Sequence, residues 1–107
     1  MTAHFTYKVG DTAPAFRIQL LTSVGLPQDL TGATAQLRIK KPSGKKLAGA
    51  LTVEGGIEGY VNRSWVAGDL DVAGLYLAEV EVTFSGGAVQ TYPAYGHIRL
   101  FVSEQLD

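Results

Sequence analysis

The residues best suited to proton transfer in this chain are two histidines. His4 lies close to the N-terminus, and His97 occupies an outward position on a predicted strand. A catalytic histidine acts on a nucleophile within hydrogen-bond reach, and these two positions instead favour surface histidines. The chain contains no cysteine, which excludes thiolate catalysis and disulfides.

Paired carboxylates are the second arrangement that could support chemistry. Glu79 and Glu81 share one face of a predicted strand, and Asp69 and Asp71 flank a predicted turn. Two carboxylates can cleave a glycosidic bond, and aspartate oxygens are calcium ligands. The turn lacks the further spaced oxygen ligands of a calcium loop, and such pairs are common on solvated strands. The sequence therefore predicts no enzyme, no catalytic residue, no metal site and no cofactor.

Four lysines surround one predicted turn within residues 40–46. One interpretation is a docking site for an acidic partner or surface. The other is a solvated hairpin tip whose lysines protect the strand edge against aggregation, and it is favoured because the cluster is short and isolated. The whole chain has 9 Lys and Arg against 10 Asp and Glu, a net charge of -1. It therefore lacks the basic excess of nucleic-acid-binding domains, and no nucleic-acid partner is expected.

The elements that position these residues show a two-residue repeat of apolar and polar side chains, which is typical of β-strands. Residues 16–20, 33–40, 76–84 and 98–102 alternate apolar and polar side chains. Turn signals rich in Gly and Pro separate these runs at short intervals. The sequence predicts an all-β fold, an immunoglobulin-like antiparallel β-sandwich of seven or eight strands. Its predicted core includes Phe16, Ile18, Leu20, Leu37, Ile39, Val80, Val82, Ile98 and Leu100.

Length and hydropathy set further bounds. The 107 residues correspond to a single domain over residues 1–107. The apolar stretches run to only a few residues, so no membrane span is expected. The first residues lack a basic region followed by an apolar region, so no signal peptide is expected.

A turn before the strand at residues 76–84 resembles the tyrosine corner of immunoglobulin-like domains. Asp71 and Gly74 precede Tyr76, whose hydroxyl is predicted to bond back to the loop while its ring is buried. The spacing from Asp71 to Tyr76 is five residues, one more than in the usual motif. Trp65 is predicted to face the core as well. These four residues are expected to have structural roles.

Outward-facing apolar residues are candidates for a contact surface. The alternation that buries Tyr76 turns Leu75 and Leu77 away from the core, and on the last strand it turns Phe101 outward. A contiguous exposed apolar patch marks a partner surface. Leu75, Leu77 and Phe101 are therefore the predicted interface. The alternative is that Leu75 or Leu77 lies under a loop.

Six short motifs follow one another along the chain, at residues 10–14, 28–34, 41–44, 59–65, 73–79 and 91–93. Their order resembles the immunoglobulin-like domain of tailed-phage tail and baseplate proteins, with the N-terminal domain of baseplate upper proteins as the best comparison. The resemblance covers about residues 8–102. The sequence Asp-Leu-Thr-Gly-Ala-Thr at residues 29–34 is its most specific element.

The resemblance implies a structural protein of a phage or prophage virion, in the tail or baseplate. Its partners would be other virion tail or baseplate proteins and further copies of itself, and it would be made in the host cytoplasm and located in the virion. Baseplate proteins continue beyond this domain, whereas this chain stops at Asp107. Its position in a tail, baseplate or capsid is therefore left open.

Two further functions remain open at this point. One is a carbohydrate-binding adhesion module on a virion or cell surface, for which exposed aromatic residues would be needed. The candidates are Tyr92, Tyr95 and Trp65. The other is a capsid decoration protein.

Overall fold

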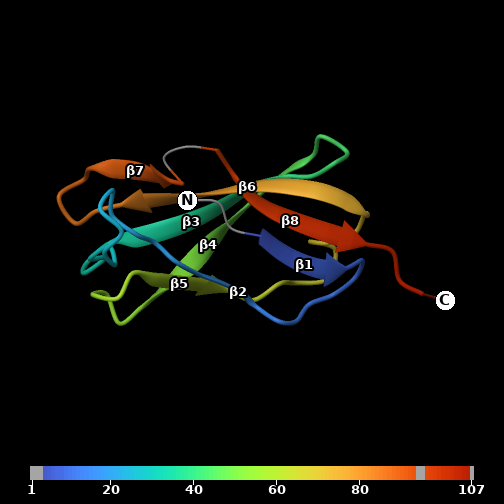
Figure 1. Cartoon of the computed structure of the whole chain (residues 1–107), viewed down its shortest axis with the longest axis horizontal. Coiled ribbons are helices and arrows are strands. Elements are labelled where there is room, and N and C mark those ends of the chain that lie inside the picture. Colours follow the sequence, from blue (N-terminus) through green and yellow to red (C-terminus); the bar gives the residue numbers. More distant parts are fainter. Residues whose placement is uncertain (1–3, 94–95, 107) are drawn as a thin grey trace.

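Eight strands make up the secondary structure of the computed structural model, which describes residues 4–93 and 96–106 (Figure 1). No helix occurs within these residues, and none of them forms a segment that could cross a membrane as a helix. The predicted all-β class is confirmed. The strands are β1 (His4–Lys8), β2 (Phe16–Gln19), β3 (Thr34–Lys40), β4 (Lys46–Glu54), β5 (Tyr60–Arg63), β6 (Gly74–Thr83), β7 (Val89–Tyr92) and β8 (Ile98–Ser103).

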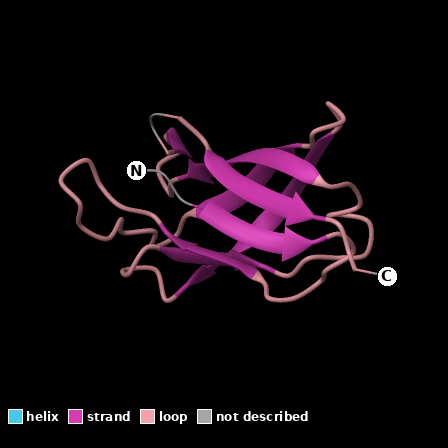
Figure 2. Ribbon diagram, turned by 45° about the vertical axis from the view of Figure 1, so that its right-hand side comes forward, coloured by secondary structure: helices cyan, strands magenta, loops and turns pink. Residues whose placement is uncertain are grey.

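The strands form one curled sheet in the order β1-β8-β6-β3-β4-β5-β2, with β7 also paired to β6. Strand β4 produces the curl, because its first part pairs with β3 and its last three residues pair with β5. The sheet therefore folds into two layers around the core (Figure 2).

One pairing departs from the predicted antiparallel arrangement. Strands β1 and β8 are parallel, whereas the other strand pairs are antiparallel. A parallel pair needs a long connection between its strands, and the rest of the domain provides one between the first strand and the last. Alternation along the sequence shows which face of a strand is buried but not which neighbour it has.

The core lies between the two layers and contains every residue predicted for it. All nine are at most 7% exposed, from Phe16 at 0% to Ile18 at 7%. Trp65 also faces inward, as predicted, and so does Val61 of β5. Truncating a Leu or Ile here to Ala costs roughly 2–5 kcal/mol, because the cavity left behind does not close completely.

Aromatic rings close the space between the two edge strands, β1 and β2. The ring centroids of Phe5 and Phe16 lie 5.0 Å apart, and those of Tyr7 and Trp65 lie 5.5 Å apart in an edge-to-face arrangement. Burial raises the pKa of the Tyr7 hydroxyl, an effect that the nearby Trp65 indole opposes. The Trp65 indole nitrogen has no partner with hydrogen-bond geometry within the described chain. Ring packing therefore holds Trp65 in place.

The turn before β6 has the hydrogen bonds of a tyrosine corner. Tyr76 is fully buried, and its hydroxyl donates to the Val72 carbonyl at 2.6 Å while accepting from the Val72 amide at 3.1 Å. Gly74 has a φ of 136°, and a Cβ there would lie 2.6 Å from Cγ of Pro42. Only glycine allows this close approach, which packs the turn after β3 against the start of β6.

Candidate docking face

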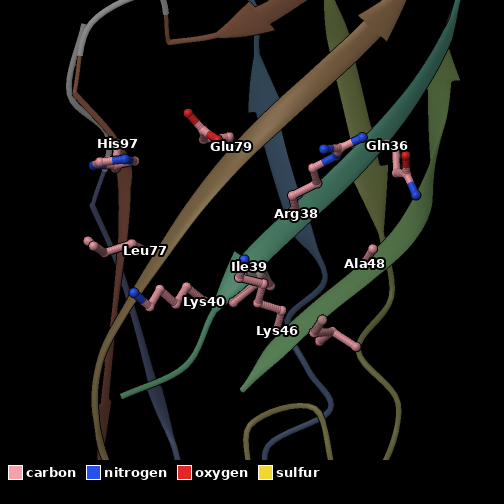
Figure 3. A pocket seen from close by; sticks show the side chains of 10 residues that line it. Gln36, Arg38, Ile39, Lys40, Lys46, Ala48, Leu77, Glu79 and His97 are labelled. Atoms are coloured by element: carbon pink, nitrogen blue, oxygen red, sulfur yellow. The ribbon is translucent and has the colours of Figure 1, made fainter. Parts of the chain in front are cut away.

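The outer face of the sheet made by β4, β3, β6 and β8 is hollowed. The hollow has a volume of about 500 Å³ (Figure 3). Its lining side chains include Arg38 and Lys40 from β3, Lys46 from β4, and Leu77 and Glu79 from β6. The hollow therefore combines three cationic side chains with apolar ones, which include Leu77 and Ala48.

The strand register explains why these residues meet. Lys46 lies opposite Lys40, Lys40 opposite Leu77, Leu77 opposite Arg99, and Arg99 opposite His4. Neighbouring strands are about 4.8 Å apart, so this row crosses about 19 Å of the sheet. We call Lys46, Lys40 and Arg99, with Leu77 between Lys40 and Arg99, the cationic row, which His4 continues on β1.

The cationic row is electrostatically unfavourable for folding. Lys40 and Lys46 are both exposed and directly opposite each other, an arrangement that destabilises an antiparallel pair. Leu77 separates them from Arg99, and the row itself contains no carboxylate. A row of this kind favours a ligand with negative charge.

The next row of the same face is closer to neutral. Arg38 lies opposite Glu79, and its guanidinium donates to the Glu81 carboxylate at 3.1 Å. His97 is exposed beside this row. Within the described residues, Lys40, Lys46 and Arg99 form no ion pair, whereas Arg38 of the next row pairs with Glu81. Figure 3 shows Lys40, Lys46 and Leu77 beside Arg38 and Glu79.

On the other side of the cationic row lies the predicted interface. Leu75 and Phe101 are direct partners across β6 and β8 and are 38% and 41% exposed. The His4 ring stacks on Phe101 with centroids 5.8 Å apart, and Leu77 is partly exposed in the cationic row itself. The three predicted residues thus share one outward face, although their role in binding stays a prediction. They place apolar surface directly beside positive charge.

Asp69 and Asp71, the predicted carboxylate pair at a turn, bind two different cations. Asp69 is buried, and one of its oxygens accepts from Arg63 at 3.0 Å and from the Val66 amide at 2.9 Å. Asp71 accepts from Lys41 at 2.8 Å, and this ammonium holds the pKa of Asp71 below its ordinary value. Neither carboxylate is free to share a calcium ion with the other.

Lys41 corrects the interpretation of residues 40–46 as a solvated tip. It is only 5% exposed, and its ammonium donates to Asp71 and to the Gly68 carbonyl at 3.0 Å. Lys40 and Lys46 instead belong to the cationic row, while Lys45 is exposed at the turn. One buried cation therefore fixes the turn that presents the other two.

The remaining predicted candidates lie on the outer surface, where Glu79 and His97 line the same hollow. His4 and His97 are exposed, and Glu79 and Glu81 point outward as neighbours of Arg38. Within residues 4–93 and 96–106, no group of three or more His, Asp or Glu side chains is placed to hold a metal ion.

The aromatic candidates for sugar binding are not available as stacking surfaces. Trp65 is 3% exposed, and Tyr92 is 3% exposed with its hydroxyl donating to Gln28 at 2.9 Å. Tyr95 lies outside the described residues.

Arg99 is the site residue that sequence reasoning missed, and His4 was expected only as a surface histidine. Both occupy outward positions of alternating strands, but they stand 95 positions apart in the chain. Only the β1–β8 and β6–β8 registers bring them beside Lys40 and Lys46. The one sign of this in the sequence was that Arg99 occupies an outward-facing position in the alternating pattern of the last strand.

Comparisons with known proteins give a structural neighbour and no sequence relative. No protein-family model and no curated protein matches the sequence. Among solved structures, the chain is similar to CopC from Methylosinus trichosporium OB3b, with a TM-score of 0.58 and 11% sequence identity. The match covers 98% of this chain and 88% of that one. At this identity the likeness establishes the β-sandwich fold alone.

This comparison contradicts the expected function. CopC, a structural neighbour matched over 98% of this chain, is not a tail, baseplate or capsid protein. The predicted role as a structural protein of a virion is therefore wrong, and the carbohydrate-binding and capsid alternatives that accompanied it are set aside. The motif order that suggested it consists mostly of turn sequences, which many β-domains share because Gly and Pro suit tight turns.

Proposed function

We propose that this protein is a non-enzymatic binding module that docks an acidic segment of a protein partner on the outer face of β4, β3, β6 and β8. The cationic row is the observation that carries the proposal. Two lysines directly opposite each other weaken the sheet, and an acidic ligand relieves that repulsion. Charge complementarity of this kind also speeds association and excludes partners of the wrong sign.

The apolar residues favour a polypeptide as the ligand. Leu77 lies within the cationic row, and Leu75 and Phe101 lie beside it. A segment that alternates acidic and apolar side chains can contact both the positive charges of the row and these apolar residues. A long nucleic acid fits less well, because the protein carries 10 carboxylates and a net charge of -1.

Isothermal titration calorimetry tests the proposal with the full chain and an octapeptide of alternating Glu and Leu. We expect binding that weakens as salt rises, and at least about tenfold weaker binding for Lys40→Glu. The matched control is Lys8→Glu on β1, an exposed lysine about 13 Å along the strand from His4. It should bind as the wild type does.

Two readouts separate a binding defect from a folding defect. The free energy of unfolding of Lys40→Glu should equal or exceed that of the wild type, because the repulsion with Lys46 is removed. The same peptide with Gln in place of Glu should bind weakly to every variant. Equal affinity for the Glu and Gln peptides would overturn the proposal.

A further inference from the structure

A second surface of the molecule combines exposed apolar residues with negative charge. It consists of two turns, residues 21–29 and 55–59, which we call the acidic turns. Val24, Leu26 and Ile57 are 77%, 62% and 67% exposed, and Asp29 and Glu58 are exposed on the same two turns. Highly exposed apolar residues gathered on one part of a surface mark a contact site.

The acidic turns are bound to each other and form one surface. The Leu20 amide donates to the Gly59 carbonyl at 2.7 Å, and the Leu30 amide donates to the Gly56 carbonyl at 2.6 Å. Gly59 has a φ of 76°, and a Cβ there would lie 2.5 Å from the Leu20 oxygen. Glycine thus permits the two turns to touch.

The tip of the first turn is also ordered by hydrogen bonds. The Thr22 amide donates to the Leu26 carbonyl at 2.7 Å, and the Leu26 amide donates back to the Thr22 hydroxyl at 3.2 Å. Asp29 is held by the Thr31 amide and hydroxyl, which keep the pKa of Asp29 below its ordinary value. The apolar and acidic side chains are therefore presented on a fixed backbone.

The acidic turns lie toward one end of an elongated molecule, and the turn flanked by Lys40 and Lys46 lies toward the other. Its extents are 47 × 23 × 21 Å, and the acidic turns lie at the left of Figure 1 while the turn between β3 and β4 lies toward the right. Lys40 and Lys46 flank that second turn. One chain cannot bring the two surfaces together, but two chains can.

We propose that the partner of the cationic row is the pair of acidic turns on a second copy of this chain. Asp29 and Glu58 of one copy would face Lys40, Lys46 and Arg99 of the next, while Leu26 and Ile57 pack on Leu77, Leu75 and Phe101. This inference rests on the proposed function and names its ligand. The contact joins two different surfaces, so copies associate head to tail into a ring or an open chain.

Sedimentation velocity of the full chain tests this association. We expect the weight-average sedimentation coefficient to rise with protein concentration and to fall as salt is added. The face variant carries Lys40→Gln with Lys46→Gln, and the turn variant carries Asp29→Asn with Glu58→Gln. Each should associate at least about tenfold more weakly than wild type. Lys8→Gln with Glu104→Gln, at exposed positions outside both surfaces, is the control.

Mixing the two variants gives the sharpest outcome. Each variant keeps one intact surface, so an equimolar mixture should form a 1:1 dimer and no larger species. Growth of the mixture to the size of the wild-type assembly would overturn the inference, as would unchanged association of either variant alone.

The result for the wild type separates this inference from the function on which it rests. A wild-type chain that stays monomeric up to about 1 mM but binds the Glu–Leu peptide leaves the docking face intact and makes the partner a different protein. A chain that neither associates nor binds the peptide refutes both proposals.

Discussion

The two ends of this sandwich differ in how their loops are held. At the first end, which we call the pinned end, residues 41–45 and 66–74 are tied together by buried groups, with Lys41 at 5%, Asp69 at 5% and Leu70 at 1% exposure. At the second, the acidic turns are held by backbone hydrogen bonds and leave Leu26 and Ile57 more than 60% exposed. Side chains at the pinned end stabilise the fold, whereas those of the acidic turns are available for contact.

The difference bears on function because the pinned end positions the cationic row. Lys41 anchors the turn after β3 to residues 68–71, and Pro42 packs on Gly74. These contacts fix the point at which β3 becomes β4, and so the register that sets Lys40 opposite Lys46.

The largest effect is expected at the buried Arg63–Asp69 pair. Asp69→Ala leaves the Arg63 guanidinium, whose side chain is 15% exposed, without its carboxylate, and it removes the acceptor of the Val66 amide. We expect a loss of about 3–5 kcal/mol in the free energy of unfolding measured with urea. Glu54→Ala, which breaks the exposed pair with Arg17, should cost far less. Equal losses would remove the distinction between buried and exposed pairs.

Two leucines allow the same substitution at both ends. Leu70→Ala at the pinned end removes a fully buried side chain and should cost roughly 2–5 kcal/mol. Leu26→Ala, at 62% exposure in the acidic turns, should change the stability by at most about 0.5 kcal/mol. Thermal or urea unfolding measures both. A large loss for Leu26→Ala would show that the acidic turns support the fold.

Tyrosine hydroxyls provide a finer comparison. Tyr76→Phe keeps the ring but leaves both backbone groups of Val72 without this partner, which should cost about 0.5–1.5 kcal/mol. Tyr92→Phe removes a single bond to the Gln28 side chain and should cost less. If Tyr76→Phe were as stable as the wild type, the tyrosine corner would have no role in stability.

The smallest effect is expected in the way the free energy of unfolding changes at acidic pH. Lys41 lowers the pKa of Asp71 in the folded state, so their pair stabilises the fold above the unfolded pKa of about 4. This contribution is lost as the pH falls through the lowered folded-state pKa. Urea unfolding should show wild type more stable than Asp71→Asn at pH 7, with the gap closing toward pH 2. A gap that stayed constant across this range would contradict the assignment.

Much of the fold is predictable from the sequence, because the burial of one face of each strand determines the order of apolar and polar residues along it. A strand with one buried face must alternate, and this places all nine core residues and the inward Tyr76. The parallel β1–β8 pair is not predictable in this way, because alternation carries no information about which strands are neighbours.

The candidate site is less predictable for the same reason. The sequence shows that Lys40, Arg99 and Leu77 point outward, but their meeting in one row depends on the register between strands. It also groups Lys41 with its neighbours, whereas tertiary contacts with Asp71 and Gly68 bury it. The function inferred from motif order failed because turn sequences record local geometry and not the surface of the sheet.

The most direct test of the docking face is an amide chemical-shift titration of the ¹⁵N-labelled chain with the Glu–Leu octapeptide. We expect the largest shifts at Lys40, Lys46, Leu77 and Arg99, with smaller shifts at Leu75 and Phe101 and none at Arg17 and Tyr60 on the other layer. Shifts confined to that other layer, or no shifts at peptide concentrations that saturate other acidic-peptide binders, would contradict the proposed docking face.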